Sequence, residues 1–528
     1  MFSMGLSTHE ISVKDLFVGN RQRLVAQLQQ DDAARHGVIY LCGGPSQERF
    51  DSDHEPIFRQ ESYFQYLTGV KEPDCAVLID VESGSTTLFI PRLPADYATI
   101  MGKIRTTAEW QDMYHMDSVR FQDETMEVLE QSLHLNAAAA TNGGSNGKKS
   151  KKLLLLKGVN SDSGNTYQPP KNVIQKFDNT ALVDVDTLFP ILADLRVYKS
   201  PAELGVLRYV TEVTSFAHAY VMRNMKPGMM EYQGESLFRH YCYYSYGCRL
   251  VGYTPICGCG PNAAILHYGH AGEPNARQTQ AGDTCLFDMG CEYFCYGSDV
   301  TCSFPVTGKF TTQQRAIYAA VLNAQVAVYN MLRPGVSWVA CHKAAELEIL
   351  KKLVEIGLVI PGDKSLEDLV EMRLGAIFMP HGLGHFIGID THDVGGYLKG
   401  NPERIALPGL KSLRTARILH ENMTLTVEPG CYFIDHLLDV ALAEDSPLKS
   451  YLDDTKIAAY RGFGGVRLED VVVITATNCI NYTLCPRTTE EVELVMGGGK
   501  WPPMKDSAPE LRRERLTDVT PLPSPPSL

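Results

Sequence analysis

The sequence has few of the features that mark a membrane or extracellular protein. No run of apolar residues approaches the ~18 that a membrane-spanning helix needs. Residues 1–17 lack a basic start followed by an apolar stretch, so we predict no secretory signal. Fourteen cysteines among 528 residues are too few for a disulfide-held scaffold. We therefore expect a cytoplasmic protein with free thiols and no membrane partner.

Positive charge is also scarce. Lysine and arginine number 49 against 62 aspartates and glutamates, which gives a formal net charge of −13. This balance, without a basic stripe, argues against nucleic acid as a partner. The hydrophobic fraction of 44% and the charged fraction of 21% are ordinary for a globular protein. At about 150 residues per domain, the length predicts two or three domains.

The first third of the chain alternates helical and strand patterns. Residues 20–29 (NRQRLVAQLQ) have helical spacing, and residues 38–42 (VIYLC) form a short apolar run that predicts a strand. Residues 76–81 and 86–90 predict two more strands around a turn. We therefore expect an N-terminal α/β domain over residues 14–185.

The rest of the chain divides by composition. Residues 137–152 (AAAATNGGSNGKKSKK) are of low complexity and predict a solvated insertion in the N-terminal domain. From residue 186 to residue 496 we expect a larger α+β domain, with a helix over residues 201–225. Residues 497–528 are charged and then rich in proline, which predicts a disordered tail.

Two aspartates lie in apolar, strand-like runs. Asp288 and Asp299 occur in CLFDMGCEYFCYGSDVTCSF, where Tyr296 and Gly297 predict a bend between them. Two antiparallel strands would bring both carboxylates to one face. Because burial of a lone carboxylate is unfavourable, such a residue needs a partner cation or a metal. The alternative is a pair of carboxylates at a sheet edge or a turn.

Three histidines follow within twelve positions. His381, His385 and His392 occur in PHGLGHFIGIDTHDVGG, whose glycines let backbone segments approach closely. The spacing of His381 and His385 is that of the zinc-binding helix motif His-Glu-x-x-His. We reject that motif because the glutamate is missing and glycine is a poor helix former. Any one of these histidines could instead be a hydrogen-bonded core residue.

Two glutamates complete the set of candidates. Glu428 lies at the end of a predicted strand in LTVEPG, just before a Pro-Gly turn. Glu469 lies in GGVRLEDVVVIT, which predicts a central strand. Arg467 is two residues earlier and therefore shares a face with Glu469, where it can orient neighbouring carboxylates. The alternative for either glutamate is a surface position.

Together these residues predict an oxygen-rich metal site. Four carboxylates and one imidazole suit manganese, or else cobalt or zinc, better than a metal selected by thiols. Four carboxylates exceed the needs of one ion, so we expect two ions about 3.5–4 Å apart. The nearby cysteines lack paired C-x-x-C spacing and are interpreted as small apolar residues. They are Cys257, Cys259, Cys285, Cys291, Cys295 and Cys302.

The motifs occur in an order that resembles a known enzyme family. The segments are FRQESYFQYLTGV, LFIPRLPADYATIMGKI, ICGCGPNAAILHYGHAG, LFDMGCEYFCYGSDVTCSFPVTGKF, FMPHGLGHFIGIDTHDVGGY, GLKSLRTARIL, LTVEPGCYFIDHLL and RGFGGVRLEDVVV. Over residues 20–496 the chain resembles the pita-bread metallopeptidases, and most closely the eukaryotic Xaa-Pro dipeptidases (prolidases). The resemblance implies an α/β N-terminal domain followed by an α+β catalytic domain of the pita-bread, creatinase/aminopeptidase-like type.

The resemblance also implies roles for individual residues. The implied metal ligands are Asp288, Asp299, His385, Glu428 and Glu469. The implied substrate-binding residues are His267, His381, His392, Arg414 and Tyr253. Glu428 would also shuttle the proton, and His392 with His267 would stabilise the reaction intermediate. Arg414 would bind the free carboxylate of a dipeptide. Ile100 departs from the mammalian relatives, which have tryptophan at that position.

The activity implied by the resemblance is hydrolysis of Xaa-Pro dipeptides by a hydroxide that bridges two manganese ions, in a homodimer. Aminopeptidase P, which acts on longer peptides with proline second, is one alternative. A non-catalytic binding protein on the same fold is another, but such proteins lose ligands and are often basic. A creatinase-like hydrolase works without metal and lacks the full ligand set. Fold alone does not decide among these functions.

Overall fold

The computed structural model describes residues 1–134, 150–177, 182–269 and 275–521. Within them the chain divides into two compact units. The first unit comprises residues 1–3 and 10–196, and the second comprises residues 4–9 and 197–528. None of the helices in these described ranges combines the length and hydropathy of a membrane span.

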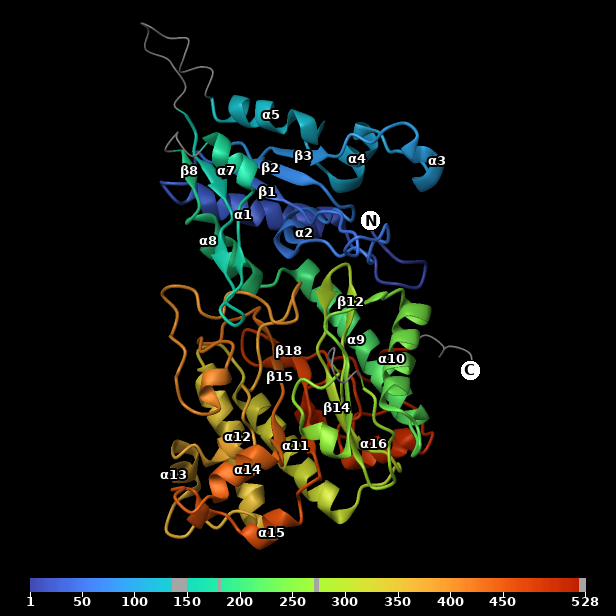
Figure 1. Cartoon of the computed structure of the whole chain (residues 1–528), viewed down its shortest axis with the longest axis vertical. Helices are drawn as coiled ribbons and strands as arrows, with labels where there is room; N and C mark the ends of the chain where they lie inside the picture. Colours follow the sequence, from blue (N-terminus) through green and yellow to red (C-terminus); the bar gives the residue numbers. More distant parts are fainter. Residues whose placement is uncertain (135–149, 178–181, 270–274, 522–528) are drawn as a thin grey trace, which may run out of the picture. The chain divides into compact units, whose positions relative to one another are not determined.

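The first unit is an α/β domain, as the sequence predicts (Figure 1). Its six-stranded sheet has the strand order β4-β3-β2-β1-β5-β8, with β1 antiparallel to β2 and parallel to β5. Its elements are α1 Gly19–Gln29, β1 Val38–Cys42, α2 Ser62–Thr68, β2 Ala76–Asp80, β3 Thr86–Ile90, α3 Tyr97–Met101, α4 Thr107–Tyr114, β4 Ser118–Phe121, α5 Thr125–Ser132, β5 Leu153–Leu155, β6 Gly158–Val159, β7 Thr166–Tyr167, α7 Lys171–Phe177, β8 Val183–Asp184 and α8 Leu188–Val197.

Both faces of this sheet are buried. Val38 and Tyr40 of β1 share a core cluster with Leu129 of α5 and Phe177 of α7. Ile39, which points to the opposite face, is also fully buried. A strand covered on both faces reads as a continuous apolar run, which is why VIYLC predicts β1 so well.

The predicted insertion, residues 137–152, lies mostly outside the described residues. Its last three residues, 150–152, are described, and Lys151 and Lys152 make ion pairs with the folded unit. Lys151 Nζ lies 2.6 Å from the Asp80 carboxylate at the end of β2, and Lys152 Nζ lies 3.6 Å from Asp184 in β8. These ion pairs hold the lysines to the strand ends, so the insertion is shorter than the composition predicts.

The second unit is built from small antiparallel sheets flanked by long helices (Figure 1). The sheets have the orders β10-β11-β14, β13-β12-β9, β15-β18-β19 and β16-β17. Its elements are α9 Pro201–Asn224, α10 Glu231–Tyr246, β9 Leu250–Val251, β10 Ile256–Cys259, β11 Thr284–Asp288, β12 Cys291–Tyr293, β13 Tyr296–Gly297, β14 Thr301–Pro305, α11 Thr312–Met331, α12 Trp338–Glu355, α13 Leu366–Glu371, β15 Thr424–Val427, β16 Gly430–Tyr432, α14 Asp435–Leu442, α15 Asp454–Ala458, β17 Gly465–Arg467, β18 Asp470–Ile474, β19 Cys479–Asn481 and α16 Thr489–Met496.

Helices α9 and α11 pack on different sheets of this unit. Helix α9 contacts β12 and β13, whereas α11 contacts β16 and β17. The start of α9 is encoded locally, because Ser200 and Glu203 form a reciprocal capping box around Pro201. The two helices therefore cover two different sheets of the unit.

The prediction of a disordered tail from residue 497 is wrong for residues 497–521. Trp501 is 5% exposed, and its indole N–H donates to the Leu484 carbonyl at 2.8 Å. The Arg513 side chain is fully buried and makes two hydrogen bonds to Glu491 in α16, at 2.8 and 2.9 Å. Composition suggested disorder because one charged partner of Arg513, Glu491, lies outside the tail, although Asp506 inside the tail also pairs with it at 2.6 Å. Residues 522–528 lie outside the described residues.

Candidate metal centre

Two antiparallel strands bring Asp288 and Asp299 together. Asp288 is the last residue of β11 and pairs with Thr301, the first residue of β14, so Asp299 lies two residues before β14. The predicted bend at Tyr296 and Gly297 is wrong, because these residues form β13 and pair with β12. The chain instead reverses two residues earlier, at Phe294 and Cys295. Both residues have positive φ angles, 48° and 69°.

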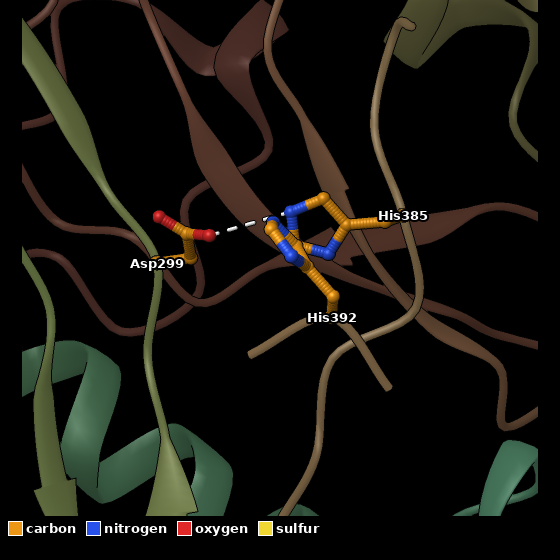
Figure 2. A group of neighbouring side chains, drawn as sticks. All are labelled: Asp299, His385 and His392. Atoms are coloured by element: carbon orange, nitrogen blue, oxygen red, sulfur yellow. Dashed lines mark ion pairs between the residues drawn. The ribbon is translucent and has the colours of Figure 1, made fainter. Parts of the chain in front are cut away.

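His385 lies on a loop that packs tightly against β15. A Cβ on Gly384 would lie 2.1 Å from the Thr426 carbonyl, so only glycine permits this approach. The His385 amide donates to Thr426 Oγ1 at 3.0 Å, and Nδ1 lies 2.9 Å from the Phe386 carbonyl. A carbonyl oxygen only accepts a hydrogen bond, so Nδ1 carries the hydrogen and Nε2 presents its lone pair. Nε2 is 3.3 Å from Asp299 Oδ2 (Figure 2).

Glu428 follows β15 directly and faces the same imidazole. Its amide donates to the Leu383 carbonyl at 2.8 Å, which fixes the backbone where the strand ends. Oε1 accepts from Thr426 Oγ1 at 3.2 Å and lies 3.5 Å from His385 Nε2. Oε2 lies 3.9 Å from His381 Nδ1. The Glu428 carboxylate therefore lies between the two histidines.

Glu469 and Arg467 flank the junction between β17 and β18. The Glu469 carboxylate accepts from Thr301 Oγ1 at 2.7 Å, and its amide donates to the Thr301 carbonyl at 3.1 Å. Arg467 donates to Asp288 Oδ2 at 2.6 Å and to Thr301 Oγ1 at 3.0 Å. As predicted from their spacing, both side chains reach the same cluster, where Arg467 holds one carboxylate in place.

The five predicted ligands come together in the fold. Their donor atoms form overlapping groups within 4.8 Å, one with Asp288, Asp299 and Glu469 and another with His385, Glu428 and Glu469. Asp299 Oδ1 is buried and has no hydrogen-bond partner within the described protein. Such an orphaned acceptor is unfavourable unless a cation binds it. The donor set therefore fits one or more hard divalent cations.

The electrostatics of the cluster also fit cations. Burial raises the pKa of Asp288 to about 6, against the opposing effect of Arg467. Burial likewise raises the pKa of Glu428 to about 7. Burial, followed by the charges of Asp299 and Glu428, raises the pKa of Glu469 well above its usual value. A bound cation would turn this mutual repulsion into attraction.

The predicted substrate-binding histidines lie at the edge of this cluster. The His392 ring centroid is 4.5 Å from that of His385, with the rings almost perpendicular (Figure 2). A donor atom of His392 lies within 4.8 Å of donor atoms of both Asp299 and His385. His381 is half-buried, and burial lowers its pKa to about 3, with Arg467 adding to the effect.

The remaining predicted residues surround the same site. Tyr253 donates a short hydrogen bond to Asp288 Oδ1, so its hydroxyl reaches the metal cluster itself. His267 is exposed and Arg414 is half-buried. Desolvation lowers the pKa of His392, and the charges of Arg414 and His267 contribute to the lowering. Both side chains are therefore close enough to His392 to act on it electrostatically.

Sequence reasoning missed Tyr432. Its hydroxyl accepts from Arg467 at 2.8 Å and lies 3.0 Å from His381 Nε2, so it links Arg467 to His381. The residue is fully buried at the end of β16. The segment EPGCY could have indicated this residue, because its tyrosine follows Glu428 after a Pro-Gly turn. A tyrosine in an apolar run is, however, usually a core residue.

A buried cluster of four carboxylates and one imidazole is the donor set of a divalent-metal enzyme. Residues 206–476 match the Metallopeptidase family M24, and residues 17–140 match the aminopeptidase P N-terminal domain. This chain belongs to metallopeptidase family M24. The prediction of a hydrolase with an α/β domain and a pita-bread catalytic domain is confirmed.

Individual relatives are similar over nearly the whole chain. The human Xaa-Pro dipeptidase is 47% identical over 499 residues, which cover 94% of this chain and 96% of that protein. The structure of Pseudomonas aeruginosa aminopeptidase PepP has a TM-score of 0.73 at 28% identity, covering 93% of this chain and 99% of that one. Zinc-substituted Escherichia coli aminopeptidase P in complex with product has a TM-score of 0.71 at 28% identity, covering 93% and 100%.

Proposed function

We propose that this chain is a metal-dependent dipeptidase that hydrolyses dipeptides with a C-terminal proline. The observation that carries the proposal is the buried cluster of Asp288, Asp299, His385, Glu428 and Glu469, in a chain 47% identical to a dipeptidase across 94% of its length. The similarity to aminopeptidase P structures is weaker, at 28% identity. The complete ligand set argues against a non-catalytic binding protein.

The same five residues would hold two divalent cations. Bound cations lower the pKa of water and polarise a carbonyl oxygen, so they supply the nucleophile and a Lewis acid. Manganese is the ion that the oxygen-rich donor set favours, with cobalt or zinc as substitutes. Arg467 and Tyr253 hold Asp288 in place through hydrogen bonds.

Glu428 is the residue that moves the proton. Its carboxylate is buried and approaches two histidines, so it can take a proton from the attacking water and deliver it to the proline nitrogen as the bond breaks. His392, with His267, donates hydrogen bonds to the oxygen of the tetrahedral intermediate. His381 and Arg414 bind the proline end of the substrate.

The bond to proline suits a site that does not depend on an extended substrate backbone. The proline nitrogen carries no hydrogen, and its ring fixes the backbone angle φ. Recognition then rests on the free carboxylate after the bond, for which an arginine fork is the matching partner. One fixed pocket accepts one isomer, so we expect the trans Xaa-Pro bond to be cleaved, although about 10–30% of such bonds in free peptides are cis.

We further propose a homodimer in the cytoplasm. Ile100 and Met101 of α3 are 85% and 61% exposed, and an exposed pair of large apolar residues favours a protein partner. The family resemblance implies tryptophan at the position of Ile100, so this contact would differ in chemistry from that of the mammalian enzymes. All fourteen cysteines are free thiols, which suits a reducing compartment.

The proposal is tested by comparing two substrates on one preparation. Purified protein is stripped of metal, reloaded with Mn²⁺ and assayed on Gly-Pro and on Gly-Pro-Ala, with the metal content measured in parallel. We expect Gly-Pro to be hydrolysed, Gly-Pro-Ala to be a poor substrate and activity to require the metal. Preference for the tripeptide would support the aminopeptidase P function instead, and full activity without metal would overturn the metal site.

A further inference from the structure

A buried ion pair lies behind the loop that carries His392. Lys199 Nζ is 2.9 Å from Asp393 Oδ2, and both side chains are only 1% exposed. The two residues are 194 positions apart in the chain, and Asp393 directly follows His392. A fully buried Lys–Asp pair loses the hydration of both charges, so such a pair contributes more to a defined conformation than to stability.

The loop between the two histidines is closed on itself. The Asp393 amide donates to the Phe386 carbonyl at 2.9 Å, and Phe386 forms a bridge with Leu425 in β15. His385 therefore lies immediately before the residues that close the loop, and His392 is the last residue inside it. Any displacement of Asp393 moves the His392 ring relative to the His385 ring, whose centroid is 4.5 Å away.

Lys199 is a fixed anchor for this loop. It immediately precedes Ser200, the N-cap of α9, and its amide donates to the Asn422 carbonyl at 3.0 Å. The backbone of Lys199 is thus held by a helix and by the turn that precedes β15. Its ammonium group reaches the loop from outside, without passing through the metal cluster.

The space between the pair and the loop backbone leaves no room for a side chain. A Cβ on Gly388 would lie 2.3 Å from Asp393 Oδ2 and 3.1 Å from Lys199 Cε. The glycine in HFIGIDTHD therefore permits the ion pair to pack directly on the loop. The Thr391 hydroxyl adds a second tether, because it donates to the Gly252 carbonyl at 3.1 Å.

We propose that the Lys199–Asp393 ion pair positions the His392 imidazole beside the metal centre. The inference rests on the proposed function, in which His392 contacts the substrate. Lys199 and Asp393 are positioning residues and touch neither substrate nor metal. They determine where the His392 ring lies, and through it the rate of the reaction.

The test is a double-mutant cycle on the full chain loaded with Mn²⁺. Lys199→Met with Asp393→Asn removes both charges without leaving one of them buried alone. We expect this neutral pair to lower kcat/KM for Gly-Pro by about tenfold to a hundredfold, the loss typical of a misplaced catalytic group. In a His392→Ala background the same change should lower kcat/KM less than about threefold, because the group that it positions is absent.

Two further measurements separate positioning from general damage. Mn²⁺ affinity, measured by titration calorimetry, should stay unchanged in the neutral pair. Lys151→Met with Asp80→Asn, the matched Lys–Asp pair of the first unit, should lower the melting temperature without changing kcat/KM. If the neutral pair does not fold, Lys199→Arg, which keeps the charge but not the geometry, replaces it in the cycle.

Each outcome has a defined meaning. An equal loss in both backgrounds, or no loss in either, would overturn the positioning role while leaving the dipeptidase proposal intact. Full activity of His392→Ala alone would reject the role of His392 in the proposed function, and this inference with it.

Discussion

The two units of the chain bury charge in different ways. In the first unit, Lys151 pairs with Asp80 at 2.6 Å, and the buried Arg21 donates to the carbonyls of Leu67 and His115, both at 2.8 Å. Burial acts against ionisation of Asp80, but hydrogen bonds from Lys151 outweigh it and lower the pKa. Each of these charges therefore has a protein partner that stabilises it.

The metal centre of the second unit lacks this balance. Four carboxylates converge there on Arg467 and His385, and the pKa values of Asp288, Glu428 and Glu469 are raised. Away from the centre the second unit pairs its buried charges as the first does, for example Arg513 with Glu491. The surplus of negative charge at the site marks where the protein binds something that it does not itself supply.

The largest effect should follow from removing one carboxylate of that surplus. Glu469→Gln deletes a shared ligand, so we expect Mn²⁺ binding to weaken and activity to fall about a thousandfold, since metal catalysis contributes several kcal/mol. In metal-free protein the same change should leave the melting temperature equal or higher, because like charges repel less. Calorimetric titration, kinetics and thermal unfolding measure the three quantities.

The matched change in the first unit should behave in the opposite way. Asp80→Asn leaves Lys151 without its main partner, so the free energy of unfolding should fall by ~1–3 kcal/mol. The activity of the folded enzyme should not change. If Glu469→Gln lowers the stability of metal-free protein as much as Asp80→Asn does, the contrast between the two units is wrong.

The carboxylates of the candidate metal centre stood out locally, whereas the choice of His385 among three histidines rested on the family resemblance. A carboxylate inside an apolar run such as LTVEPG conflicts with its surroundings, and a bound cation is one way to resolve the conflict. Strand β1 was predictable for a similar reason, since VIYLC has no polar position that would allow another structure. In both cases the information lies within a few residues of the feature.

Features that depend on distant partners could not be predicted. Lys199 and Asp393 are unremarkable in the sequence, and only the fold brings them together across 194 residues. Within residues 497–521, Arg513 depends partly on Glu491, which precedes the tail, so the composition of the tail alone suggested disorder. The hairpin turn at Phe294 and Cys295 contains neither glycine nor asparagine, the residues that usually indicate a turn. The bend was therefore predicted at the nearby Gly297.

A smaller effect, specific to one substrate, should follow from Arg414→Ala. A charge-assisted contact to the dipeptide carboxylate contributes ~1.5–3 kcal/mol, which corresponds to a loss of roughly tenfold to a few hundredfold in kcat/KM for Gly-Pro. A blocked Gly-Pro amide has no carboxylate and should lose much less. The matched control is Lys411→Ala, because Lys411 is an exposed cation on the same loop. Equal losses on both substrates would reject the carboxylate role and favour the aminopeptidase P function.

The smallest effect concerns the first unit, and it tests how far the charge pairing there extends along the chain. Residues 137–149 are rich in alanine, glycine, asparagine and lysine, a composition that cannot form a core. Their replacement by a Gly-Ser linker of about half the length should change the free energy of unfolding by no more than ~0.6 kcal/mol, with kcat/KM unaltered.

Extending the replacement through residue 152 removes Lys151 and should lower the free energy of unfolding by ~1–3 kcal/mol, and restoring that one lysine should recover it. Urea unfolding of the three variants distinguishes the cases. A large loss from the shorter replacement would mean that the segment packs against the unit, and no loss from the longer one would mean that Lys151 does not stabilise it.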